Sequence, residues 1–491
     1  MRRRGEGLSD RTGVAARDAR NEGSQPMKID RAGQISAQTW AVALLIACAA
    51  AIWIPAIWTP FWGDDYVYLY GARLANQTGQ SWFQTFWPTQ PLQFWRPLSQ
   101  EAWWRIVESA MASHARVAHT AALAWHLLAA AAVGLAGAAL ARASDWLRPG
   151  RVGVLAGAIY GVLALNVLPV HWVAAVNSSI LVMFTGLILA AWLAAGVAGG
   201  RTARLLLLAA VPVLFVLALL SKESAVLTPV LMVGFALFAR VRWRRGHVAT
   251  LAACVVIAAV WLALRAQVTV PPAAQYSYAF GLNLVRNAVS LVAWLFNVPR
   301  EALRMLVGGN KLYALGWIAA VTILVAAVWL LALRGGIGRL QPRQWLIALA
   351  FPVVAYAPYF PLSWNSYAYY AAVASMLPVI VLARLLDGRR RVLVAALLLG
   401  CSGWLAVAGT RYLDHPGLIG RARWAEAPFR QLGQQPITPP LWVRVEDEHR
   451  FYAMGPYGLA WRLGLPLSEI HRVDACPPRP GTCLVIRSGD R

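Results

Sequence analysis

The amino-acid sequence predicts an all-α polytopic membrane protein. Hydrophobic residues make up 59% of the 491 residues and charged residues only 13%, whereas soluble domains carry about 25% charge. Apolar runs of about 20 residues recur along the chain, and a run of that length spans the hydrocarbon core as a helix. The net charge of +24 does not indicate nucleic-acid binding, because the arginines lie in short tracts between apolar runs, as in cytoplasmic loops.

The first element is a tail, residues 1–36, that is polar, basic and without periodicity. We expect this tail to be disordered and cytoplasmic. It contains no apolar core followed by a small-residue cleavage site, so we expect the first apolar run to be retained as a helix rather than removed as a signal peptide.

The second element is a transmembrane domain over residues 37–412 with about eleven spans. Arginine-rich connections alternate with connections poor in basic residues, such as LPVHWVAAVNSS. The positive-inside rule then places the N-terminus in the cytoplasm and the C-terminus outside. We expect the spans at 39–59, 117–140, 152–170, 178–198, 204–221, 224–240, 248–266, 312–333, 344–362, 367–386 and 392–412.

One segment, 284–309, has two interpretations. Its apolar content would allow a twelfth span, but it contains Arg286, Arg300, Glu301 and Arg304. A twelfth span would also place the arginine-rich RGGIGRLQPR outside and reverse every later loop. We therefore predict a helix that lies at the outer interface.

Two further pieces are expected outside the membrane. The loop 60–117 is rich in Trp, Phe and Tyr that alternate with polar residues, which predicts short interfacial helices. The segment 413–491 mixes strand-like LWVRV and TCLVIRS with the helical YGLAWRLGL, which predicts a small periplasmic α+β domain. Cys476 and Cys483 in this domain would close a short disulfide loop in an oxidising compartment.

Acidic residues are absent from the centres of the predicted spans and gather at the outer edge. The absence counts against an ion-coupled transporter. At the edge, Asp64 and Asp65 directly follow the first span, and Glu223 adjoins Lys222 in the turn LLSKESAVLTP. His171 lies in another outer turn, and His119 lies seven residues before His126, on the same helical face.

These side chains suggest a chemistry. A carboxylate at a partly dehydrated interface acts as a general base because burial raises its pKa. A nearby cation, Lys222 or Arg96, would hold a phosphate leaving group. A base and a phosphate-binding cation at the edge of a bilayer suit sugar transfer from a lipid-linked phosphate donor.

Five motifs in order carry a family resemblance: FWGDDYVYLYGARLA, FWRPLSQEAWW, AHTAALAWHLLAAA, LPVHWVAAVNSSILVMFTGLILAAWLA and LLSKESAVLTPVLM. In this order they resemble the GT-C superfamily of membrane glycosyltransferases. The branch is similar to bacterial relatives of the protein O-mannosyltransferases, including those with tetratricopeptide repeats in animals, although no such repeat is visible here. The resemblance covers roughly residues 40–240 well and the remainder only in general layout.

The resemblance implies a multi-pass protein of a bacterial inner membrane, a polyprenyl-phosphate sugar donor, and an acceptor that is a protein or a glycolipid. It implies that Asp64, with Asp65 beside it, serves as catalytic base or binds a divalent metal, and Glu223 would supply a second ligand. Two departures stand out. No acid follows His171, where related sequences often carry one, and Asn365 stands near Tyr367 where they often carry an arginine.

Each candidate residue also has a structural interpretation. Asp64 and Asp65 would stop a helix at the interface, Lys222 and Glu223 would form an ion pair in a turn, and Arg96 would anchor the loop. His171 and His119 would be structural hydrogen-bonding groups, and Tyr367 would belong to an aromatic belt rather than line a substrate site. The alternative functions are a lipid-linked-sugar flippase and a catalytically inactive GT-C-like partner protein.

Overall fold

The computed structural model describes residues 36–88, 90–111, 114–271, 273–363, 367–387, 390–412, 420–433, 437–478 and 480–487. Within these residues, seven helices are long and apolar enough to cross a membrane, and a bent helix pair would make an eighth. The predicted class, a polytopic helical protein with a small C-terminal α+β segment, is confirmed. The predicted tail, 1–36, lies outside the described residues except for Ser36.

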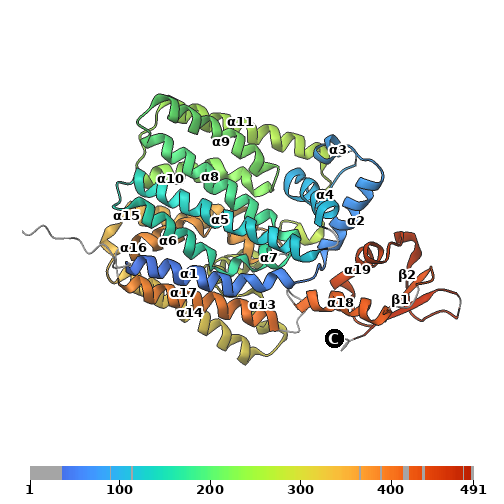
Figure 1. Ribbon diagram of the computed structural model, residues 1–491. Helices are drawn as coiled ribbons and strands as arrows, with labels where there is room; N and C mark the ends of the chain where they lie inside the picture. Colours follow the sequence, from blue (N-terminus) through green and yellow to red (C-terminus); the bar gives the residue numbers. More distant parts are fainter. Residues whose placement is uncertain are drawn as a thin grey trace, which may run out of the picture. The chain divides into compact units, whose positions relative to one another are not determined.

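The long helices run side by side (Figure 1). They are α1 (Ala37–Trp53), α5 (Ala115–Ala143), α8 (Asn177–Val197), α9 (Arg201–Leu219), α11 (Arg245–Val268), α14 (Lys311–Leu333) and α17 (Arg391–Tyr412).

The predicted span 152–170 is a broken helix. It consists of α6 (Pro149–Gly161) and α7 (Val167–His171), with a bend of 56° between them. The break leaves the Gly161 carbonyl without a partner in its own helix. Trp53 Nε1 of α1 and His126 Nε2 of α5 donate to this carbonyl oxygen at 2.6 and 3.2 Å, so three helices meet there.

Three other predicted spans are shorter in the structure, so the expected total of eleven stays a prediction. Residues 224–240 hold α10 (Thr228–Ala239), residues 344–362 hold α15 (Pro342–Tyr356), and residues 367–386 hold α16 (Met376–Leu386). A single helix of this length does not reach across the hydrocarbon core, which takes about 20 residues.

The predicted interfacial helix 284–309 is divided into α12 (Leu282–Leu295) and α13 (Arg300–Gly308). Asn297 separates them with a φ of 60°. Its side-chain oxygen accepts a hydrogen bond from the Ala164 N–H at 3.0 Å, which fixes the break against the bend between α6 and α7.

The first long loop forms short helices at one end of the long ones (Figure 1). They are α2 (Asp64–Gln77), α3 (Trp82–Phe86) and α4 (Trp103–Ile106), with π-helical turns on both sides of α4. Short helices were predicted here.

The C-terminal segment contains α18 (Gly420–Leu432), α19 (Glu448–Leu463) and a parallel sheet with strand order β2-β1-β3. Strand β1 (Leu441–Val445) lies between β2 (Ile470–Val473) and β3 (Thr482–Ile486). The predicted strands, the predicted helix and the Cys476–Cys483 disulfide are all present.

The close approach of α5 and α6 generates a stability prediction. A Cβ atom at Gly153 would lie 2.5 Å from the Gly134 carbonyl oxygen and 2.7 Å from the Ala138 Cβ, whereas one at Gly150 would meet nothing within 4 Å. We expect Gly153→Ala to lower the free energy of unfolding by about 1–3 kcal/mol. Gly150→Ala should stay within about 0.5 kcal/mol of wild type. Denaturant unfolding in detergent measures both, and equal midpoints would contradict this packing.

Candidate active site

The site begins at the N-terminus of α2, directly after a left-handed turn at Gly63. The φ and ψ of Gly63 are 59° and −126°, a conformation that favours glycine because glycine has no Cβ. The Gly63 N–H donates to the Ala453 carbonyl oxygen at 2.6 Å, so α19 helps to fix the turn. Asp64 and Asp65 then occupy the first turn of α2, where the helix dipole favours negative charge.

Asp65 is fully buried, and its carboxylate positions the N-terminus of α2. Its Oδ1 accepts a hydrogen bond from the Ala174 N–H at 2.7 Å, and its Oδ2 accepts one from the Trp62 N–H at 3.2 Å. Burial raises the pKa of Asp65 well above its ordinary value, and these two backbone hydrogen bonds oppose the shift. The carboxylate therefore ties α2 to the turn before α8.

Asp64, by contrast, is exposed. Its side chain reaches solvent, yet the surrounding protein excludes enough water to raise its pKa. The Arg421 guanidinium of α18 opposes this shift. A solvent-accessible carboxylate with a raised pKa meets the requirements of a general base, and this geometry favours Asp64 over Asp65 for that role.

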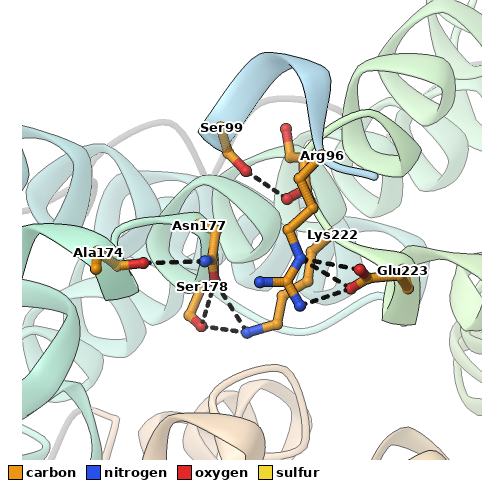
Figure 2. Close-up of polar contacts among 8 residues, drawn as sticks. Arg96, Ser99, Ala174, Asn177, Ser178, Lys222 and Glu223 are labelled. Atoms are coloured by element: carbon orange, nitrogen blue, oxygen red, sulfur yellow. Dashed lines mark hydrogen bonds and ion pairs between the residues drawn. The ribbon is translucent and has the colours of Figure 1, made fainter. Parts of the chain in front are cut away.

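Lys222 lies in the turn after α9 and is 3% exposed. Its Nζ donates to Asn177 Oδ1 at 3.0 Å and to Ser178 Oγ at 2.5 Å, as Figure 2 shows. The Tyr369 ring centroid is 4.6 Å from Nζ. Burial lowers the pKa of Lys222 well below its ordinary value, and Arg96 adds to the shift. Lys222 thus joins the turn after α9 to the first turn of α8.

Arg96 and Glu223 form an ion pair that ties the first loop to the same turn (Figure 2). Arg96 Nε donates to both Glu223 oxygens at 3.0 Å, and its Nη2 donates to Oε2 at 2.9 Å. Burial disfavours the charge of Arg96, but Glu223 outweighs burial and the pKa of Arg96 is raised. Glu223 thus pairs with Arg96 and not with its neighbour Lys222, and this ion pair holds the first loop against the turn.

Tyr367 connects this region to a group of arginines. Its ring stacks on Tyr369 with centroids 5.3 Å apart and an interplanar angle of 11°. The Arg300 guanidinium lies 4.0 Å from the Tyr367 ring centroid. The tyrosines therefore form a wall that leads from Lys222 to Arg300.

Sequence reasoning missed three functional candidates, Arg300, Arg304 and Arg421, which we call the arginine cluster. Burial lowers the pKa of Arg304 and of Arg421, and the charge of Arg300 lowers both further. Within the described ranges, no carboxylate forms an ion pair with any of the three. Arg300 and Arg304 could have been found from the sequence, because they are charged residues within the amphipathic segment 284–309. No local sequence pattern connects Arg421 to them.

Glu301, the neighbour of Arg300 on α13, is 1% exposed. Neither of its carboxyl oxygens has a hydrogen-bond partner in the part of the chain that the structure describes. Burial raises its pKa to about 7, and Arg300 opposes the shift. Near neutral pH the arginine cluster is thus only partly balanced by this acid.

The histidines lie in the packed interior. His119 is fully buried, and its Nδ1 lies 3.3 Å from the Val170 carbonyl oxygen. His171 is also fully buried, and its carbonyl oxygen accepts from Trp62 Nε1 at 3.0 Å. The geometry favours the structural interpretation of both residues over a place in the lining of the site.

The metal site that the resemblance implies does not fit these residues. Among the described residues, no group of three or more His, Cys, Asp or Glu side chains is placed to hold a metal ion. Both oxygens of Glu223 are occupied by Arg96.

The fold and the site define a class: a multi-pass helical membrane protein in which an accessible carboxylate, Asp64, lies within electrostatic range of Arg421 of the arginine cluster. No family model and no curated protein sequence matches the chain. Among solved structures, the chain is similar to the crystal structure of ArnT from Cupriavidus metallidurans in the apo state. The TM-score is 0.49 and the sequence identity 17%, over 89% of this chain and 86% of that chain.

The raised pKa of Glu301 predicts a pH dependence of stability. Since the folded pKa of about 7 exceeds the ordinary 4.5, the folded state binds more protons between these values, and stability falls as pH rises from about 4.5 to 7. We expect Glu301→Gln to remove this pH-dependent loss. Between pH 4.5 and pH 7.5, the difference in unfolding free energy between the variant and wild type should therefore shift by about 1–3 kcal/mol in favour of the variant. Thermal unfolding across this range measures it, and parallel curves for the two proteins would contradict the assignment.

Proposed function

We propose that this protein is a GT-C-type membrane glycosyltransferase, similar to the O-mannosyltransferases, that moves a sugar from a polyprenyl-phosphate donor to an acceptor hydroxyl. One observation carries the proposal: the accessible Asp64 carboxylate lies within electrostatic range of the arginine cluster through Arg421. A base and an excess of guanidinium groups are the two components that displacement of a phosphate requires.

In this mechanism Asp64 takes the proton from the acceptor hydroxyl. The acceptor oxygen attacks the anomeric carbon, and the bond from that carbon to the phosphate oxygen breaks, so the configuration inverts. Burial raises the pKa of Asp64, which brings it closer to the value that proton transfer at neutral pH favours.

The departing phosphate keeps the electron pair and gains negative charge. Guanidinium groups stabilise this charge because they bind phosphate oxygens in a bidentate manner. Arg300, Arg304 and Arg421 are suited to this role, since they form no ion pair within the described residues. Lys222 and Arg96 were the sequence candidates for this role, but Asn177, Ser178 and Glu223 engage them. We therefore assign these two residues to holding the turn and the first loop beside the donor-phosphate site.

The polyprenyl tail would lie among the long helices, with its phosphate at the helix ends. The site then faces the periplasm of a bacterial inner membrane, with the N-terminus in the cytoplasm and the C-terminus outside. The acceptor is a protein or a glycolipid that reaches Asp64 from the aqueous side.

The mechanism predicts the effect of Asp64→Asn. The amide keeps the shape of the side chain but accepts no proton, so we expect turnover to fall about 10²–10⁴-fold. Donor binding and folding should persist, because Asp65 and not Asp64 ties α2 to the bundle. With a membrane extract that supplies the acceptor hydroxyls, mass spectrometry of polyprenyl phosphate released from synthetic polyprenyl-phosphate mannose, glucose and arabinose measures the rate.

Asp145→Asn provides the matched control. Asp145 is exposed and follows the C-terminus of α5, so this substitution should leave the rate unchanged. If Asp64→Asn turned over at the wild-type rate, Asp64 would not be the base. If the wild-type protein itself released no phosphate from any donor, the inactive-partner alternative would replace the enzyme.

A further inference from the structure

A polar cleft of about 630 Å³ lies between the first long loop and the C-terminal helices. Its lining includes Phe61, Arg73, Glu108, Glu426, Trp461 and Arg462. The volume falls within the range of small-molecule sites, about 300–1,000 Å³. Asp64, Lys222 and the arginine cluster do not line it, so the polar cleft is distinct from the candidate active site.

One wall of the polar cleft is built on Arg73 of α2. Its Nε lies 3.3 Å from Glu108 Oε1, and its Nη1 donates to the Trp461 carbonyl oxygen at 2.6 Å. Asn76 Nδ2 donates to Glu108 Oε2 at 2.9 Å, which fixes the carboxylate from a second side. The wall thus presents ordered donors and acceptors.

The opposite wall is a second ion pair, from the C-terminal helices. Arg462 donates from Nη1 and Nη2 to the two oxygens of Glu426, at 3.3 and 3.4 Å. The Arg462 guanidinium also lies 4.6 Å from the Phe429 ring centroid. Both side chains of the pair remain about one-third exposed, at 37% and 30%, so they are accessible to a ligand.

Aromatic groups lie between the walls. Trp461 is 7% exposed, and within the described chain its indole Nε1 has no hydrogen-bond partner. The Arg73 guanidinium lies 4.8 Å from the Trp461 ring centroid, and Phe61 meets that ring edge-on at 6.1 Å.

The charge balance of the polar cleft selects the ligand class. Two carboxylates and two guanidinium groups cancel, so no excess charge attracts a phosphate or a polyanion. Hydrogen-bonding groups beside aromatic rings instead match a molecule with many hydroxyls and weakly positive C–H faces. A neutral saccharide has this chemistry.

Two helices, α2 and α18, contribute side chains to both the polar cleft and the candidate active site. Arg73 follows Asp64 by nine residues on α2, which corresponds to about 13 Å along the helix axis. On α18, Glu426 follows Arg421 by five residues, or about 7 Å. At about 100° per residue, nine residues place Arg73 on the opposite face of α2 from Asp64. An acceptor held in the cleft therefore has to reach around the helix to meet Asp64.

We propose that the polar cleft binds a neutral saccharide and that this saccharide is the acceptor of the transfer. The acceptor role rests on the proposed function, whereas saccharide binding does not. If the acceptor is a glycolipid, the cleft then binds its uncharged sugars and not its lipid.

Direct binding tests the proposal. The full chain is placed in phosphatidylcholine nanodiscs, because maltoside detergents carry a competing sugar. Mannotriose and maltotriose are titrated by calorimetry and by saturation-transfer NMR, with trigalacturonate as the anionic comparison. We expect a neutral trisaccharide to bind with a Kd of about 1 mM or tighter, and trigalacturonate to bind at least about tenfold more weakly.

Arg73→Gln and Glu426→Gln should each weaken this binding about tenfold, since each removes a charged hydrogen-bonding partner. Arg472→Gln is the matched control: Arg472 pairs with Glu448 at the surface of the C-terminal segment and outside the cleft lining, and its loss should change nothing. Melting temperatures identify any variant that fails to fold. If Arg73→Gln does not fold, the binding result for Glu426→Gln tests the proposal.

Absence of binding by both neutral trisaccharides, equal binding by wild type and both cleft variants, or tighter binding of trigalacturonate would overturn the proposal. Asp64→Asn should bind the trisaccharide like wild type. Retained binding without any sugar transfer would therefore reject the proposed function alone. Transfer without saccharide binding in the cleft would reject this inference alone.

Discussion

The two hydrogen bonds that the buried Asp65 carboxylate accepts from the Trp62 and Ala174 N–H groups hold the N-terminus of α2 against the turn before α8. A buried carboxylate is costly unless hydrogen bonds compensate it, so these contacts specify one position for the helix. Asp64 and Arg73 both extend from α2, so the candidate base and one wall of the polar cleft depend on this attachment.

Charge compensation then separates residues that hold the structure from residues that are free to act. Lys222 is engaged by Asn177 and Ser178, and Arg96 is engaged by Glu223. The Lys222 contacts join the turn after α9 to α8, and the Arg96–Glu223 pair holds the first loop against that turn. The charge of Arg300 lowers the pKa of Arg304 and of Arg421, and such repulsion is relieved when an anion binds. The observation that sets this site apart is the excess of positive charge beside Asp64.

The sequence predicted those features that depend on local pattern. Membrane-length apolar runs identify α5 and α14 without tertiary information, and short spacing identifies the Cys476–Cys483 loop. The short helices α10 and α16 were missed because an apolar run does not distinguish one straight span from a short helix after an irregular turn. Arg421 was missed because its neighbours Arg300 and Asp64 come from distant parts of the chain, and only the fold brings them together.

The central claim is that a lipid-linked phosphate binds where Asp64 and the arginine cluster meet. The most direct measurement is an electron cryo-microscopy structure of the full chain in nanodiscs that contain polyprenyl phosphate. The account predicts phosphate density in hydrogen-bonding contact with Arg300, Arg304 or Arg421, on the side of Asp64. Phosphate density bound elsewhere, out of reach of every one of these side chains, would contradict it.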